Sequence, residues 1–272
     1  MALFASAPQI NASQINYNSL IQQVLPNQGY TFPVRWGKTA KQLVDSNALN
    51  VSALSAILNS SGEPLTLEQK KILNGTSNAN VILNNSYALF TLDVLWGIGV
   101  NNNNPIINSG PITQSGNDPN NFASTGGYQP LGNLQLGKLN LIALTPQQQT
   151  LMYDVATHSY RPCCDNPTAF PDCNHGAAAL ALVELMISQG NSENATFEAV
   201  KEFNSFYFTQ YYMYDAIFLR SHGIDWNNVP ASYIVGYNFS SLSGAIHAAQ
   251  YDQKYKLLPQ SSNGGSSASC AA

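Results

Sequence analysis

The sequence predicts an all-α protein: an irregular helical domain around a buried central helix, with one long inserted loop. Three observations predict this fold class. Apolar residues recur at spacings of three and four over much of the chain. Capping boxes mark helix starts at Thr66 and Thr145. The segment 176–189 is nearly all apolar, and a helix that is apolar on every side is a buried one.

Composition limits the classes of function. The 272 residues are 44% hydrophobic but only 10% charged, with a net charge of −4. Binding to nucleic acid needs clustered Lys and Arg, so we expect no nucleic-acid partner. No run approaches the roughly 20 apolar residues of a membrane span, so we expect none. We expect one globular domain over residues 1–259 and a flexible Ser/Gly-rich tail over 260–272.

The first half of the chain predicts short helices and then a long loop. The expected elements are a helix over 12–25, a turn-rich segment over 26–36, helices over 38–48 and 51–58, a helix from the Thr66 capping box to Asn74-Gly75, and a helix over 81–98. Residues 101–137 are rich in Asn, Gly and Pro, and they predict a loop of unusual length.

The second half predicts longer helices. A helix is expected from the Thr145 capping box to His158, followed by a Pro-rich loop over 160–176 and the buried helix over 176–189. The longest helix should run from about 194 to 222, where Gly223 stops it and His222 bonds the last carbonyls. A short helix or a turn is expected over 225–234, and a last helix over 240–257.

The loop over 160–176 is the predicted functional site. It holds three of the four cysteines, Cys163, Cys164 and Cys173, together with His175. Its three prolines restrict the backbone and make the loop stiff. Cys173 and His175 should lie at the N-terminal end of the buried helix, where unpaired amides and the helix dipole favour a thiolate.

The main interpretation of this loop is a metal site. Three cysteines and one histidine are ligands that zinc, copper or an iron–sulfur cluster prefers, with His158 as a further ligand or a partner of one. The stretch from Cys164 to His175 resembles the motif of the CDGSH iron–sulfur family, with a proline two residues before the last cysteine. That resemblance implies a [2Fe–2S] cluster, although the adjacent cysteines and the closer histidine depart from the motif.

Two alternatives remain open. In the first, Cys173 forms a disulfide with Cys163 or Cys164, the remaining cysteine pairs with Cys270, and the protein is a structural or binding protein without metal. In the second, Cys173 is the nucleophile of a cysteine-dependent hydrolase, with His222 or His247 as general base.

Other polar residues predict the surroundings of the site. The sequence Ala5-Ser-Ala7 resembles the end of a secretory signal, so we expect a secreted, periplasmic or cell-surface location. Glu184, the one acidic residue of the buried helix, should pair with a distant arginine such as Arg220 or stay protonated. Asp165 and Asp172 could accept a hydrogen bond from an imidazole.

Overall fold

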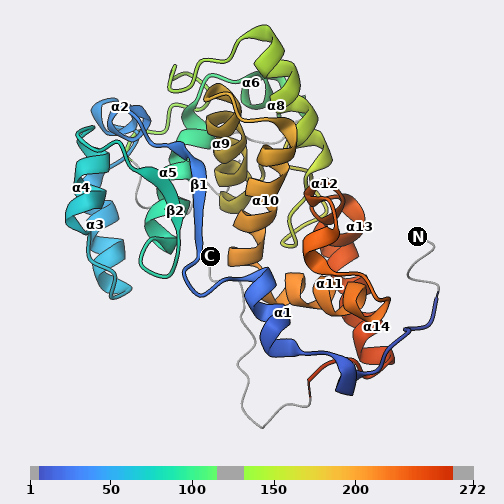
Figure 1. The fold of residues 1–272 in the computed structure, drawn as a ribbon. Coiled ribbons are helices and arrows are strands. Elements are labelled where there is room, and N and C mark those ends of the chain that lie inside the picture. Colours follow the sequence, from blue (N-terminus) through green and yellow to red (C-terminus); the bar gives the residue numbers. More distant parts are fainter. Residues whose placement is uncertain (1–5, 115–131, 260–272) are drawn as a thin grey trace.

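The computed structural model describes residues 6–114 and 132–259 (Figure 1). Helices dominate these ranges, which confirms the predicted all-α class. The elements in chain order are η2 (Ala12–Gln14), α1 (Tyr17–Val24), β1 (Tyr30–Arg35), α2 (Thr39–Asp45), α3 (Val51–Ser60), α4 (Leu67–Leu73), β2 (Asn80–Leu83), α5 (Ala88–Asn101), α6 (Pro105–Ser109), α7 (Pro111–Gln114), α8 (Pro146–His158), α9 (Asn174–Ser188), α10 (Glu193–Tyr207), α11 (Thr209–Ser221), η4 (Trp226–Asn228), α12 (Ala231–Ile234), α13 (Tyr237–Ser240) and α14 (Leu242–Lys254).

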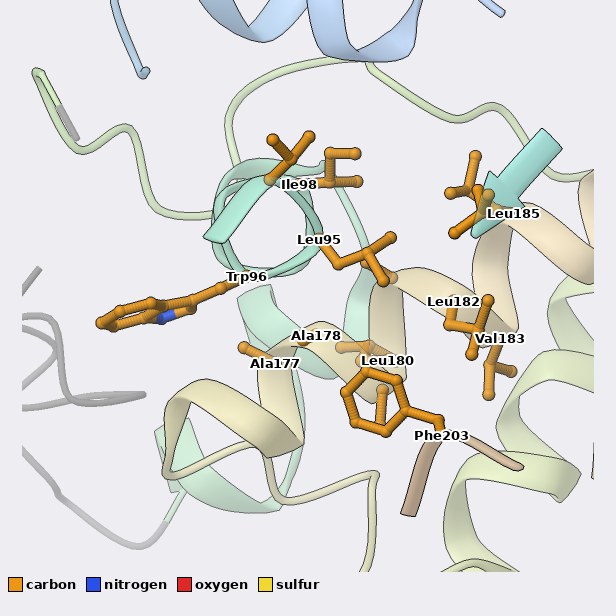
Figure 2. Packing of buried hydrophobic residues seen from close by; sticks show 14 of the residues in the cluster. Leu95, Trp96, Ile98, Ala177, Ala178, Leu180, Leu182, Val183, Leu185 and Phe203 are labelled. Atoms are coloured by element: carbon orange, nitrogen blue, oxygen red, sulfur yellow. The ribbon is translucent and has the colours of Figure 1, made fainter. Parts of the chain in front are cut away.

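Two apolar helices, α5 and α9, form the centre of the larger hydrophobic core. Both are buried over most of their length, as predicted for α9. They approach closely at Gly99, where an added Cβ would lie 1.9 Å from the carbonyl oxygen of Ala177. Figure 2 shows Leu95 of α5 on the side that faces α9, while Trp96 points the other way. In Figure 1, α10 stands beside this pair, and its Phe203 belongs to the same core.

A two-stranded antiparallel sheet corrects the sequence prediction in two places. Strands β1 and β2 pair Tyr30 with Leu83 and Thr31 with Ile82. The side chains of Phe32 and Val34 are buried while their neighbours along β1 are exposed, which is the alternation of a half-buried strand. The predicted turn-rich segment over 26–36 therefore contains a strand. The predicted helix over 81–98 was also wrong at its start, because 80–83 is a strand and α5 begins at Ala88.

A second core joins α1, α11 and α14, at the lower right of Figure 1. The single long helix predicted over 194–222 was wrong, because Phe208 separates α10 from α11 with φ −123° and ψ 38°. No proline or glycine marks this break. The hydroxyl of Thr209 donates to the carbonyls of Ser205 and Phe206, so the side chain takes backbone acceptors at the junction.

Three local signals for helix ends, at Thr66, Thr145 and His222, were confirmed. Both predicted capping boxes are present, at Thr66 and Thr145, and α8 ends at His158 as expected. His222 caps α11 through a hydrogen bond of 2.9 Å between its Nδ1 and the Phe218 carbonyl. Within the predicted long loop over 101–137, α6 and α7 are short helices, and residues 115–131 lie outside the described part of the chain.

Glu184 bonds to two side-chain amides. The expected pairing with Arg220 was wrong. Glu184 Oε1 accepts hydrogen bonds from the side chains of Asn102, at 3.0 Å, and Asn104. Burial raises the pKa of Glu184 to about 7, although the two amides lower it. Asn102 Oδ1 in turn accepts from the backbone of Leu141 and Ile142, so the buried carboxyl group anchors two loops.

Within residues 6–114 and 132–259, every helix is too short or too polar to cross a bilayer.

Candidate functional site

The predicted functional loop, residues 160–176, lies between the two cores. At its start, the amide of Tyr160 donates to the Val235 carbonyl at 2.7 Å, and the Cys164 carbonyl accepts from the Leu242 amide at 3.0 Å. At its end, Cys173 is the N-cap of α9, the central helix of the larger core. The loop is therefore fixed to the C-terminal helices through its first residues and to α9 through its last ones.

A buried arginine, Arg161, occupies the middle of this loop. Its side chain is only 1% exposed and forms an ion pair with Asp172. Both Nη atoms are bonded within the loop: Nη1 donates to the Asn166 and Pro167 carbonyls at 3.2 and 3.0 Å, and Nη2 donates to the Phe170 carbonyl at 3.0 Å and to Asp172. The loop thus wraps its carbonyl groups around the guanidinium.

The remaining N–H of this guanidinium points at sulfur. Arg161 Nε donates to Cys173 Sγ at 3.0 Å, and the same sulfur accepts the amide of Gly176 at 3.3 Å. A Cβ on Gly176 would lie 2.5 Å from Arg161 Cζ, so glycine at this position lets the guanidinium pack against the first turn of α9. An N-cap sulfur with two N–H donors is an environment that favours the thiolate.

The other two cysteines lie beside the first. Cys163 Sγ is 3.4 Å from Cys173 Sγ, and Cys164 Sγ is 3.8 Å from Asp172 Oδ1. The three described cysteines are free thiols and each is partly exposed. A disulfide bond is about 2.05 Å long, so Cys163 and Cys173 are in contact as thiols and need to approach by about 1.4 Å to form one.

The three thiols differ in acidity. Hydrogen bonds from Cys163 and Cys164, and then the charge and hydrogen bond of Arg161, hold the pKa of Cys173 well below its ordinary value, against the effect of burial. The pKa of Cys163 is raised by its hydrogen bonds to Cys164 and Cys173 and by burial. For Cys164, contact with Cys163 lowers the pKa, but hydrogen bonding to Cys173 and burial raise it to about 11. Cys173 is therefore the most acidic of the three thiols.

The predicted histidine ligands are placed differently from the sulfurs. The ring of His175 packs against Tyr207 and Phe208, with centroids 5.1 and 4.8 Å apart, and burial lowers its pKa to about 4. His158 is exposed at the end of α8, where its Nδ1 contacts the carboxylate and carbonyl of Asp154. Among the described residues, no three His, Cys, Asp or Glu side chains are arranged to hold a metal ion.

Further predicted partners of the site also have other contacts. Asp165 accepts from the amide and hydroxyl of Ser243, and Asp172 pairs with Arg161, so neither bonds an imidazole in the described structure. His222 bonds Phe218 and Tyr251 in the second core. His247 is on the exposed side of α14. Cys270 lies outside the described residues, so its predicted disulfide stays a prediction.

Sequence reasoning missed the central residue of this site. Arg161 is one of only three arginines in the chain, and it stands two residues before the cysteine pair. An arginine so close to cysteines in a stiff loop was the available signal, because a guanidinium near a thiol favours the thiolate.

Comparisons of the chain with protein-family models, with curated proteins and with solved structures found no match.

Proposed function

We propose that residues 160–176 form a dithiol–disulfide site and that the protein takes part in thiol–disulfide exchange. One observation supports this proposal above the others: Cys173 Sγ accepts a hydrogen bond from the buried Arg161 and lies 3.4 Å from a second thiol, Cys163. A stabilised thiolate with a neighbouring thiol is the arrangement that exchange chemistry requires.

The exchange has two steps. The Cys173 thiolate attacks one sulfur of a disulfide R–S–S–R, the S–S bond breaks, and one RS⁻ leaves and takes up a proton. The Cys163 thiol then loses its proton and attacks Cys173 Sγ, which expels the second RS⁻ and closes the Cys163–Cys173 bond. Two protein thiols are oxidised and one external disulfide is reduced, and every step is reversible.

Disulfide mapping tests the proposal. The full chain is incubated with oxidised glutathione, free thiols are alkylated, and peptides are identified by mass spectrometry. We expect a Cys163–Cys173 bond in the wild type and in Cys164→Ser, the matched control. Cys163→Ser should stop at a glutathione adduct on Cys173, because the second thiol is missing. Oxidation that leaves Cys163 and Cys173 as free thiols would contradict the proposal.

Alkylation rates give a second measurement of the thiolate. Cys173 should react with iodoacetamide at a pH well below the range in which Cys164 reacts, because Cys173 Sγ accepts the hydrogen bond of Arg161 Nε, whereas hydrogen bonding to Cys173 and burial raise the pKa of Cys164 to about 11. Equal pH profiles for Cys173 and Cys164 would show that the two thiols have the same acidity and would remove the basis of the mechanism.

Metal binding by the same cysteines is the second candidate function, and it rests on the proximity of the thiols, since Cys163 Sγ lies 3.4 Å from Cys173 Sγ and Cys164 is the next residue along the chain. Thiolates fit zinc, copper or an iron–sulfur cluster. Because His158 and His175 have other contacts, the ligands on this reading are Cys163, Cys164 and Cys173, and these side chains must move from the positions described above to surround an ion. Elemental analysis with thiol titration tests it: bound metal that is lost in Cys173→Ser but kept in His175→Ala supports a site of sulfur ligands alone.

The predicted location outside the cytosol is part of this proposal. Disulfides persist in secreted and periplasmic proteins, where thiol–disulfide exchange has substrates. Fractionation of the source cells, with the protein detected by an antibody, tests the location. Recovery only from the cytosolic fraction would contradict it.

A further inference from the structure

The reduced form of the cysteine site holds interactions that a disulfide cannot keep, and this difference sets the direction of exchange. In the reduced form, Cys173 Sγ accepts from Arg161 Nε, from the Gly176 amide and from the Cys163 thiol. A thiolate is a strong acceptor, whereas the sulfur of a disulfide is neutral and accepts weakly. Oxidation therefore weakens two of these hydrogen bonds and replaces the third by the S–S bond.

Arg161 cannot compensate for the loss. A guanidinium has five N–H groups, and the four on Nη1 and Nη2 already have three carbonyl oxygens and Asp172 as partners. Its side chain is 1% exposed, so solvent has almost no access to Nε. When Cys173 loses its negative charge, the Nε–H stays buried against a neutral sulfur, and the guanidinium has one anion fewer beside it.

We infer that the Cys163–Cys173 disulfide is an oxidant that donates its bond to dithiol substrates. This inference rests on the proposed dithiol–disulfide function and adds its direction and its substrate class. A disulfide whose reduced form is stabilised has a higher reduction potential, because reduction is the favourable direction. The stabilising groups here are Arg161 and the first turn of α9.

The reaction on a dithiol is balanced as follows. A substrate thiolate attacks Cys173 Sγ, the Cys163–Cys173 bond breaks, and Cys163 leaves and takes up a proton. The second substrate thiol loses its proton and attacks the substrate sulfur of the mixed disulfide, and Cys173 leaves as the thiolate that Arg161 binds. The substrate gains a disulfide, and the protein returns to its dithiol form.

The test measures the equilibrium constant for forming the Cys163–Cys173 bond in glutathione buffers. The full chain is equilibrated at a series of ratios of reduced to oxidised glutathione, quenched with acid, alkylated and quantified by mass spectrometry. In Arg161→Gln we expect the constant to rise by about tenfold or more, because the thiolate loses a charge-assisted hydrogen bond. Tenfold corresponds to a fall of about 30 mV in reduction potential.

Two further variants make the result independent of one substitution. Asp172→Asn removes the anion that competes with the thiolate for Arg161, so the constant should fall, in the opposite direction. Asp165→Asn is the matched control, since this loop carboxylate bonds Ser243, and its constant should stay within about twofold of wild type. Circular dichroism confirms the fold of each variant. If Arg161→Gln does not fold, Asp172→Asn and Asp165→Asn decide the test.

The outcomes separate the two proposals. Opposite shifts in Arg161→Gln and Asp172→Asn support the inference. A disulfide that forms with the same constant in the wild type, Asp172→Asn and any folded Arg161 variant overturns the inference and leaves the dithiol–disulfide function intact. If no Cys163–Cys173 bond forms at any glutathione ratio, the proposed function itself fails.

Discussion

Asp252 provides a prediction whose size follows directly from the structure. The side chain of this α14 residue is fully buried, and neither carboxyl oxygen has a hydrogen-bond partner among the described residues. Burial raises its pKa from the ordinary 3.8 to about 9. Asp215 on α11 is also buried, and its carboxyl oxygens have no hydrogen-bond partner within residues 6–114 and 132–259; its pKa is raised by burial and then by the charge of Asp252. At neutral pH we expect Asp252 to be protonated in the folded protein.

The raised pKa makes stability depend on pH. The unfolded chain releases the Asp252 proton above pH 3.8, whereas the folded chain keeps it until about pH 9. Across this window the folded state holds more protons, so the contribution of Asp252 to stability falls as the pH rises. The roughly three pH units between 3.8 and neutral pH, at 1.36 kcal/mol each, give a loss of up to about 4 kcal/mol at pH 7.

Asp252→Asn removes this titration. A buried amide without partners has a cost of its own, but that cost does not change with pH. We therefore expect the difference in free energy of unfolding, variant minus wild type, to grow by up to about 1.4 kcal/mol per pH unit between pH 4 and 9. Urea denaturation, followed by circular dichroism at several pH values, measures this difference.

A surface carboxylate supplies the control. Asp45 is exposed and pairs with Lys41 on the same helix, so Asp45→Asn should change stability by no more than about 1 kcal/mol at any pH. If the difference between Asp252→Asn and wild type is constant from pH 4 to 9, the carboxyl group of Asp252 is ionised in the fold or has a partner, and the reasoning from burial is refuted.

Two further predictions concern the central helix pair. Burial raises the pKa of Glu184 to about 7, so the wild type should lose about 3 kcal/mol of stability as the pH rises from 4.5 to 7. Glu184→Gln should not show this loss. Parallel pH dependence of the free energy of unfolding in both proteins would contradict the prediction. Gly99→Ala should destabilise the protein by about 1–3 kcal/mol or more, because the new Cβ would overlap the Ala177 carbonyl. Helix propensity alone predicts that Gly99→Ala stabilises the protein by about 1 kcal/mol. A fall in melting temperature therefore supports the steric overlap, and a rise contradicts it.

The parts of the fold that sequence predicted correctly depend on local chemistry. Thr66 and Thr145 each stand three residues before a glutamine, and the side chain–backbone bonds of a capping box need only those residues. Burial of α9 was equally local, because its apolar composition leaves no solvent-facing side. In both cases the interaction that fixes the element lies within the element itself.

The parts that sequence missed depend on contacts between distant segments. Strand β1 has alternating burial, but its partner β2 is about fifty residues away, and Pro33 within it favoured a turn. The break at Phe208 has no proline or glycine. It occurs where the ring of Phe208 contacts His175, more than thirty residues earlier in the chain. Such a contact appears only when the chain is folded.

The cysteine site shows the same limit in its chemistry. Ligand composition predicted that Cys163, Cys164 and Cys173 surround a positively charged metal, and that prediction awaits elemental analysis. In the structure, a positive charge already lies beside the sulfur of Cys173, on the side chain of Arg161. A metal bound by the same thiolates would sit close to this buried guanidinium, and the repulsion between two cations in a site of low dielectric constant is strong.

This repulsion links the two candidate functions through one residue. If the cysteines bind metal, Arg161→Gln should raise metal affinity, since it removes the competing cation. If they act in exchange, the same substitution should make the Cys163–Cys173 disulfide easier to form and the Cys173 thiol less acidic. Metal titration and thiol alkylation of this one variant therefore test both functions.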